Sequence, residues 1–194
     1  VAAANTANTM PAPTAIGTPS FLARRELGIV NIGGTARVAV SGDQYTLERL
    51  DVLYAGLGAG EVRFESADPA DPARLYLVST PAHRAHPNRL IPRSQARMLD
   101  RGTAEAANSR IIYQAIHPDT CASCQLVLGM TLLKPNNIWN TMPAHTHDRR
   151  SEAYLYFDLP REARIFHFLG EPQQTRHMVV ANEQAILSPG WSIH

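Results

Sequence analysis

The chain has almost no lysine, few cysteines and no long apolar run. Lys134 is the single lysine among 18 basic residues, and 17 acidic residues bring the formal net charge to +1. A chain so close to neutral carries no broad basic field, which argues against nucleic acid or an anionic membrane surface as a partner. No apolar stretch approaches the ~18 residues that a membrane-spanning helix needs, so no membrane span is expected.

The two cysteines, Cys121 and Cys124, form a single C-x-x-C pair. No second pair completes a four-cysteine zinc site, and no βαβ pattern of the thioredoxin kind surrounds this one. Two cysteines are also too few for a disulfide-stapled secreted scaffold. We interpret both as semi-buried structural thiols.

The ends of the chain look cut, since it begins without methionine and stops on His194 in a strand-like context. Residues 1–19 lack a basic segment followed by an apolar one, so no signal peptide is expected there, and a cytoplasmic location is the resulting prediction. Residues 1–20 are expected to form an extended lead-in.

Short runs of β-type residues recur about every ten residues, separated by Gly or Asp turns, from residue 28 to 78 and again from 111 to 187. This rhythm predicts an all-β sandwich or barrel. Residues 80–110 hold several prolines and little periodicity, so we expect an interdomain connection there, with a short helix over residues 103–108. A length of 194 residues allows one large domain or two small ones.

A histidine pair, His145 and His147, is followed by Glu152 and, much later, by His194. Alternate residues of a strand point to the same face, so the pair can grip one ion, provided that residues 140–143 lead into a strand. Three nitrogens and one carboxylate oxygen are typical of catalytic metal sites, which keep room for water or substrate. Zinc fits this set, as do manganese, iron, nickel and cobalt.

The other histidines have a structural interpretation. We expect His83, His86 and His117 to be hydrogen-bonded structural residues. His167 and His177 lie in β-type runs, where they could line a cavity but are interpreted as satisfied core or surface residues.

Two segments carry the pattern of the cupin motifs. They are residues 143–152, with H-x-H-x4-E, and residues 189–194, with P-x4-H. Cupins usually have glycine where this chain has Trp191, a departure that leaves the ligand itself in place. Longer strings resemble the 4-deoxy-L-threo-5-hexosulose-uronate ketol-isomerase family within the cupin superfamily. They are RRELGIVNIGG at 24–34, WNTMPAHTHDRR at 139–150, TRH at 175–177, NEQA at 182–185 and SPGWSIH at 188–194. The resemblance runs from about residue 10 to the end.

The resemblance implies a bicupin of two antiparallel β-barrel halves, truncated at both ends. Residues 1–100 would form a cupin-like domain without metal ligands, and residues 101–194 the metal-binding one. In the first half, Glu26 and Gly33 keep the spacing of a cupin motif, but no H-x-H precedes Glu26 and Ala59 stands where a late histidine would fall. One zinc ion per chain would be held by His145, His147, Glu152 and His194.

The resemblance also implies an activity: interconversion of 5-dehydro-4-deoxy-D-glucuronate and 3-deoxy-D-glycero-2,5-hexodiulosonate in pectin and oligouronide breakdown, by a homohexamer. A ketol isomerisation needs a polarised carbonyl, a proton carrier and an anchor for the carboxylate. Our candidates for the proton carrier are Glu183, Glu171, His177 and Tyr154. Our candidates for substrate binding are Arg149, Arg150, Arg176 and Trp139, because a guanidinium fork matches a carboxylate.

Three other functions stay open at this point. The first is a related isomerase acting on 5-deoxyglucuronate in inositol breakdown. The second is a cupin dioxygenase that uses iron or nickel. The third is a non-catalytic cupin that binds sugar. The metal that is bound, and the reaction of each uronate, would separate them.

Overall fold

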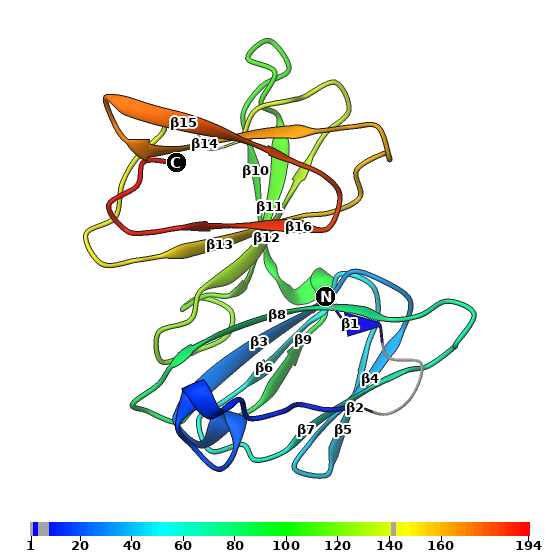
Figure 1. Cartoon of the computed structure of the whole chain (residues 1–194). Helices are drawn as coiled ribbons and strands as arrows, with labels where there is room; N and C mark the ends of the chain where they lie inside the picture. The colour runs from blue at the N-terminus through cyan, green and yellow to red at the C-terminus, as the bar shows by residue number, and fades with distance from the viewer. Residues whose placement is uncertain (1, 4–7, 141–142) are drawn as a thin grey trace. The chain divides into compact units, whose positions relative to one another are not determined.

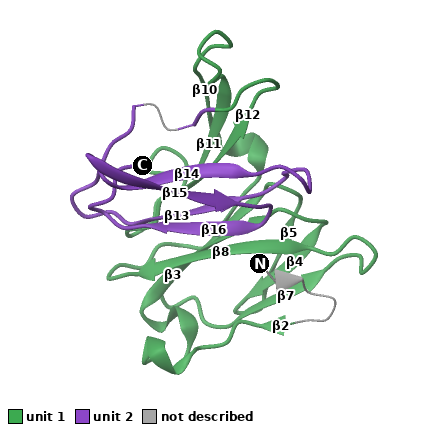
Figure 2. Cartoon of the chain, turned by 45° about the horizontal axis from the view of Figure 1, so that its top comes forward, with its two compact units in different colours: residues 1–138 green, residues 139–194 purple. Residues whose placement is uncertain are grey.

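The structure is a computed structural model that describes residues 2–3, 8–140 and 143–194. The chain divides into two compact units, residues 1–138 and 139–194 (Figure 2). Parts of two expectations lie outside the described residues: the extended lead-in over residues 1–20 and the approach to His145 over residues 140–143. Each unit is described by itself.

Unit 1 contains two antiparallel sheets of five and four strands (Figure 1). The five-stranded sheet has the order β1 (Ala2–Ala3), β8 (Arg74–Pro81), β3 (Arg25–Asn31), β6 (Val52–Ala55) and β9 (Arg89–Ile91). The four-stranded sheet has the order β2 (Asn8–Thr9), β7 (Val62–Ser66), β4 (Ala36–Val40) and β5 (Asp43–Leu47). Two short 3-10 turns, η1 (Thr14–Ile16) and η2 (Phe21–Ala23), precede β3.

The core of unit 1 lies between these two sheets. On β4 and β7 the residues alternate between buried and exposed, as strands with one face on a core do. Val38 of β4 and Phe64 of β7 pack in one cluster with Leu27 and Ile29 of β3 and Leu53 of β6. The residues of β3 and β6 are buried almost without exception, so this sheet is covered on both faces.

The face of β3 that points away from the four-stranded sheet packs against residues of a three-stranded sheet. This sheet consists of β10 (Arg97–Arg101), β11 (Arg110–Ile116) and β12 (Leu128–Leu133). Gly28 of β3 marks the contact, because a Cβ atom there would come within 2.8 Å of Leu128 Cδ2 and 3.0 Å of Ile116 Cδ1. The missing side chain lets the apolar ends of these residues reach the backbone of β3.

Glu26 is a fully buried carboxylate that fixes the loop between β11 and β12. Its Oε1 accepts the backbone N–H groups of Gln125 (2.6 Å) and Leu126 (2.7 Å). Its Oε2 accepts the backbone N–H of Cys124 (2.8 Å) and the hydroxyl of Tyr54 (2.6 Å). Burying a carboxylate is costly unless it is hydrogen-bonded, and here both oxygens have two donors each.

The expectation of an irregular connection over residues 80–110 is wrong in part. This stretch contains β9, a 3-10 turn η3 (Arg93–Gln95) and β10. The helix expected over residues 103–108 is a turn instead. Its backbone bends back through an Asn108 N–H bond to the Thr103 carbonyl (3.3 Å), and Ala107 has a φ of 52°, which an α-helix cannot accommodate.

Unit 2 contains two pairs of antiparallel strands, of which the second is a hairpin. One pair is β13 (Glu152–Tyr156) with β16 (Gln184–Ser188), and the other is β14 (Ile165–Glu171) with β15 (Gln174–Val180). An isolated bridge joins Gly170 of β14 to Ile193. This bridge pairs β14 with the segment that carries His194.

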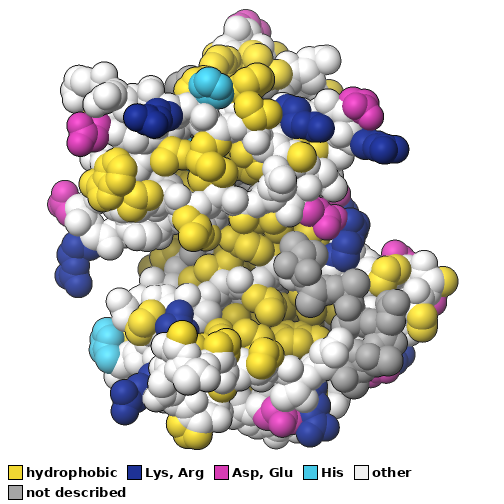
Figure 3. Space-filling view, viewed as in Figure 1, with side chains coloured by type: hydrophobic (Ala, Val, Ile, Leu, Met, Phe, Trp, Pro, Cys, Tyr) yellow, Lys and Arg dark blue, Asp and Glu magenta, His cyan; other side chains and the backbone are white. Residues whose placement is uncertain are grey.

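On β14 the side chains alternate sharply between exterior and interior. Phe166 is 60% exposed and Phe168 50%, whereas His167 between them is 6% exposed. Large apolar side chains of this kind are visible as yellow atoms on the surface in the space-filling view (Figure 3). The strand therefore turns its histidine, not its phenylalanines, toward the interior of unit 2.

Every strand pair in the described residues is antiparallel, so the prediction of an all-β antiparallel fold is confirmed. Along the chain, the boundary between the two compact units falls between residues 138 and 139. The division into cupin domains at residue 100 stays a prediction. Within the described residues, none of the helices has the length and apolar character required to cross a membrane.

Candidate metal centre

Three histidines of unit 2 gather around one point. Ligand nitrogens of His145, His147 and His194 all lie within 4.8 Å of one another. The ring centroids are 4.8 Å apart for His145 and His147, 5.0 Å for His145 and His194, and 5.1 Å for His147 and His194. This is the spacing at which three imidazoles can serve the same ion.

The backbone holds this arrangement. The N–H of His145 donates to the carbonyl of His194 (3.0 Å), and the N–H of His194 donates back to His145 (3.1 Å). Two residues later, the N–H of His147 donates to the carbonyl of Gly190 (3.1 Å). Residues 144–147 are not in a regular strand, contrary to expectation, but these bonds preserve the alternation that places His145 and His147 on the same side.

Gly190 is required by the close approach of these two segments. A Cβ atom at this position would lie 2.9 Å from the Arg150 carbonyl oxygen and 3.1 Å from that of His147. Both neighbours are backbone atoms that cannot rotate away. A side chain here would therefore push the His147 segment from the His194 segment.

Hydrogen bonds to backbone carbonyls set the orientation of two rings. Nδ1 of His145 lies 3.0 Å from the Pro143 carbonyl, and Nδ1 of His194 lies 3.2 Å from the Ser192 carbonyl. A carbonyl only accepts, so each Nδ1 donates, and Nε2 of each neutral ring keeps its lone pair. Nε2 of His194 is buried and has no hydrogen-bond partner.

Glu152, the first residue of β13, joins the three histidines. Its Oε1 lies 2.8 Å from Nε2 of His147 and 3.7 Å from Nε2 of His194. Its Oε2 accepts a hydrogen bond from the Tyr154 hydroxyl. The carboxylate thus borders the same point as the imidazoles.

The surroundings of Glu152 and His194 favour the protonation states that a metal needs. Burial alone would raise the pKa of the Glu152 carboxyl, but the hydrogen bond from Tyr154 and the neighbouring His194 and His147 outweigh it and lower that pKa. Burial lowers the pKa of His194. An ionised carboxylate and neutral imidazoles are the forms that coordinate metal ions.

The residues present fit a metal ion. Three imidazole nitrogens and a carboxylate oxygen suit zinc and other first-row divalent ions, and the buried, unpartnered Nε2 of His194 is the kind of atom that a ligand satisfies. A histidine cluster able to hold a metal ion is therefore present. The four-ligand set, with Glu152, stays a proposal.

The residues predicted to carry protons are scattered over unit 2. Tyr154 touches the centre through Glu152, and its ring centroid lies 5.9 Å from that of His194. Glu171, at the end of β14, is exposed. His177 is exposed and contacts Phe166 and Phe168, so it lies on the face of this hairpin opposite His167.

Glu183 lies in the turn before β16, next to Tyr156, whose carbonyl accepts its N–H (2.7 Å). Tyr156 and Glu152 occupy opposite ends of β13, about 13 Å apart for four residues of strand. Glu183 is thus far from the carboxylate of the metal centre.

Of the residues predicted to bind substrate, Arg150 is at the centre. Its guanidinium lies 3.7 Å from Glu152 Oε1 and is largely exposed. Arg149 and Arg176 are exposed, and Trp139 is 45% exposed. None of these three makes a hydrogen bond or an ion pair with the histidine cluster.

The interpretation of His167 as a satisfied core or surface residue is incomplete, because its buried Nε2 has no hydrogen-bond partner. The residue is buried, and its ring centroid lies 5.0 Å from that of Tyr154. The signal available in the sequence was the order Phe-His-Phe at 166–168, where strand alternation puts the histidine on the face opposite two aromatic residues.

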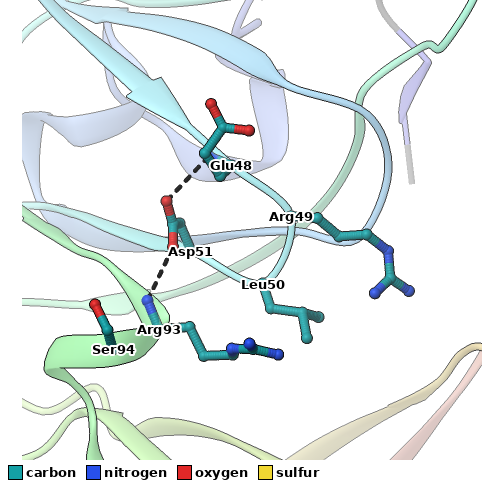
Figure 4. A pocket seen from close by; sticks show the side chains of 6 residues that line it. All are labelled: Glu48, Arg49, Leu50, Asp51, Arg93 and Ser94. Carbon is teal, nitrogen blue, oxygen red and sulfur yellow. Dashed lines mark hydrogen bonds between the residues drawn. The ribbon is translucent and has the colours of Figure 1, made fainter.

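A shallow pocket in unit 1 is a different feature. It is lined by Glu48, Arg49, Leu50, Asp51, Arg93 and Ser94 (Figure 4). Both carboxylate oxygens of Asp51 accept backbone N–H groups, from Glu48 (3.0 Å) and Arg93 (2.9 Å). These bonds give Asp51 a structural role, and the pocket has no cluster of metal ligands among the described residues.

Comparison with known proteins identifies the family of this chain. The family model described as "KduI/IolB family" matches residues 14–194. The chain belongs to the KduI/IolB family. The resemblance noted in its motifs is thereby confirmed, and the histidine cluster lies inside the matched region.

Curated members of the family are similar over nearly the whole chain. A 4-deoxy-L-threo-5-hexosulose-uronate ketol-isomerase of Shouchella clausii is 54% identical over 95% of this chain and 67% of its own length. Proteins of the same name from Caldicellulosiruptor bescii and Rhizobium meliloti are 51% and 56% identical, over 92% of this chain and 65% and 63% of their lengths. The chain thus spans about two thirds of the length of these relatives.

A solved structure supports the fold of this family member. An IolB-like protein from Salmonella typhimurium LT2 matches 99% of this chain and 74% of its own, with a TM-score of 0.75 and 20% identity. A putative glyoxylate-induced protein from Pseudomonas aeruginosa matches with a TM-score of 0.60 at 6% identity. At these identities the likeness concerns the fold alone.

Proposed function

We propose that this chain carries the metal centre of a ketol-isomerase that interconverts 5-dehydro-4-deoxy-D-glucuronate and 3-deoxy-D-glycero-2,5-hexodiulosonate. The observation that carries the proposal is the cluster of His145, His147 and His194 with Glu152 beside it, in a chain whose relatives of 51–56% identity are named for this activity. Zinc as the ion, a role in pectin breakdown, a homohexamer and a cytoplasmic location are finer parts of the same proposal, based on the motif resemblance.

The chemistry requires a proton to move between two neighbouring carbons, and its partner proton between their oxygens. A divalent ion held by the three histidines and Glu152 would supply Lewis-acid polarisation of the carbonyl and the adjacent hydroxyl. The remaining work belongs to side chains of the chain itself. They bind the carboxylate, orient the sugar chain and handle the protons.

Arg150 is the residue best placed to receive the substrate carboxylate. Its exposed guanidinium lies next to Glu152, at the rim of the centre. A planar guanidinium accepts a carboxylate through two parallel N–H bonds, which fixes orientation as well as position. Arg149, Arg176 and Trp139 stay proposals of lower rank, since they are exposed and make no hydrogen bond or ion pair with the histidine cluster.

Tyr154 serves as a donor that orients Glu152. Burial and the hydrogen bond to Glu152 raise the pKa of the Tyr154 hydroxyl, so it keeps its proton at neutral pH. A hydroxyl that is already engaged with a carboxylate is poorly suited to take a proton from carbon. Glu183, Glu171 and His177 remain proposals for the proton carrier that the geometry does not favour.

The test is an isomerase assay on the chelator-treated chain, before and after the return of zinc. We expect activity on 5-dehydro-4-deoxy-D-glucuronate to require the ion, and Glu152→Gln to lose both ion and activity. Full activity of a metal-free sample would refute the metal-dependent mechanism. A preference for 5-deoxyglucuronate, or oxygen uptake with an iron or nickel ion, would favour the competing isomerase or dioxygenase functions.

A further inference from the structure

His167 is a buried polar side chain that the proposed function has not used. It is 6% exposed, on the inward face of β14, where strand alternation calls for an apolar residue. Burial lowers the pKa of its imidazole, so the ring is neutral near pH 7. Buried polar groups in proteins are as a rule hydrogen-bonded through each of their polar atoms.

Only one side of this ring has a protein partner. Nδ1 of His167 and the Tyr156 hydroxyl lie 2.6 Å apart and share a hydrogen bond. Nε2 of the same ring is buried and has no partner. The bond to Tyr156 joins β14 to β13 and fixes the orientation of the imidazole ring. Nε2 is therefore held in one place, and no protein group forms a hydrogen bond with it.

The ring of His167 is linked to the metal centre through Tyr154. The ring of Tyr154 contacts both His167 (centroids 5.0 Å apart) and His194 (5.9 Å). In the described part of the chain, the buried side-chain atoms without a hydrogen-bond partner are Arg110 Nε, His167 Nε2 and His194 Nε2. Two of these three atoms therefore belong to imidazole rings that contact Tyr154, and one of them is in the metal-binding cluster.

We propose that Nε2 of His167 binds an uncharged oxygen, a hydroxyl or keto group, of the keto-uronate held at the metal centre. The proposal rests on the proposed function. A neutral buried imidazole offers one hydrogen bond, which suits a hydroxyl or keto oxygen, whereas a buried carboxylate would need a cation. The substrate would thus lie with its carboxylate at Arg150, on the exposed rim, and its sugar oxygens toward His167.

Two substitutions at one position separate a ligand-binding role from a structural one. The side-chain amide of asparagine reaches the place of Nδ1, so His167→Asn keeps a partner for Tyr156 but loses Nε2. The longer side chain of glutamine reaches the place of Nε2, so His167→Gln keeps the atom that would face the substrate. The exposed His83, in unit 1, provides a matched control as His83→Gln.

The experiment is calorimetric titration of the zinc-loaded full chain with the equilibrated mixture of the two uronates, together with the zinc content of each variant. We expect His167→Asn to keep its zinc and to bind the mixture about tenfold more weakly, as befits the loss of one buried hydrogen bond. His167→Gln should recover part of this loss, and His83→Gln should bind as the unsubstituted chain does.

Equal affinity of His167→Asn and the unsubstituted chain would overturn the inference, and so would loss of zinc from His167→Asn, which would mean that the residue acts on the metal site. If the unsubstituted chain neither binds nor isomerises the uronates, the proposed function fails instead. Should the variants not fold, the ¹⁵N resonance of His167 Nε2 in the unsubstituted chain decides. It should shift when the uronates bind, and an unmoved resonance contradicts the proposal.

Discussion

Replacing the carboxylate of Glu26 by an amide tests the central polar contact of unit 1. In the best arrangement, the glutamine oxygen keeps the N–H groups of Gln125 and Leu126. The hydroxyl of Tyr54 can rotate to accept from the new amide. The N–H of Cys124 then faces an NH₂ group and loses its acceptor.

The magnitude follows from this count. One unsatisfied buried donor costs about 1–3 kcal/mol, and turning two charge-assisted bonds into neutral ones costs about 1 kcal/mol each. We therefore expect Glu26→Gln to lower the free energy of unfolding by roughly 3–5 kcal/mol. That is a large share of the ~5–15 kcal/mol by which a domain is usually stable.

The assay is urea unfolding followed by circular dichroism, with amide hydrogen exchange as a local readout. Tyr54→Phe removes one of the four donors and should cost about 1 kcal/mol. Glu65→Gln, at an exposed position of β7, should stay within about 0.5 kcal/mol of the unsubstituted chain. In Glu26→Gln the amides of residues 124–126 should exchange faster than the rest of unit 1. If Glu26→Gln costs no more than Tyr54→Phe, the reasoning is wrong.

Three further predictions follow from the structure. Gly190→Ala should weaken zinc binding about tenfold in a chelator-competition titration, because the new Cβ would collide with the carbonyls of Arg150 and His147; unchanged affinity would contradict this. Burial raises the pKa of the Tyr54 hydroxyl above its unfolded value of about 10. The Tyr54 hydroxyl therefore contributes its full stabilisation below pH ~10 and loses it progressively as the pH rises from there toward its folded-state pKa. In urea unfolding, the difference in stability between Tyr54→Phe and the unsubstituted chain should be constant from about pH 6 to 9 and become smaller at higher pH. Burial also raises the pKa of the Cys121 thiol, so iodoacetamide should modify Cys124 first and Cys121 only on unfolding, as peptide mass spectrometry would reveal.

Most of the candidate metal centre was predictable because its motif is local. His145, His147 and Glu152 lie within eight residues, and their spacing alone indicates a shared ion. His194 lies more than forty residues away, so no local spacing connects it to the pair; the kind of donor set that it completes and the P-x4-H pattern of residues 189–194 both indicated it. The bond between Tyr156 and His167 joins strands of different pairs, and no short-range pattern contains that information.

The missed strands of unit 1 have a physical explanation too. Pro87 and Pro92 flank β9, which is three residues long and exists through its pairing with β6. Proline and short length both lower the local signal for a strand, while the ladder that stabilises it comes from residues 52–54, far away in sequence. Sequence patterns report local preference, and here tertiary pairing outweighs it.

Glu26 and Glu152 show how the same side chain acquires different roles from its surroundings. Glu26 keeps the spacing of a cupin glutamate, which the sequence alone could interpret only as a remnant of a metal motif. In the structure each of its oxygens accepts two hydrogen bonds, so its four lone-pair sites are occupied by donors of the protein. Glu152 faces imidazole nitrogens, and only a hydroxyl donor occupies its second oxygen. A metal ion at Glu26 would have to displace backbone N–H groups that have no other buried partner, whereas at Glu152 it would join imidazole nitrogens that can serve as ligands. The contrast is a physical reason to place the metal chemistry at the second carboxylate.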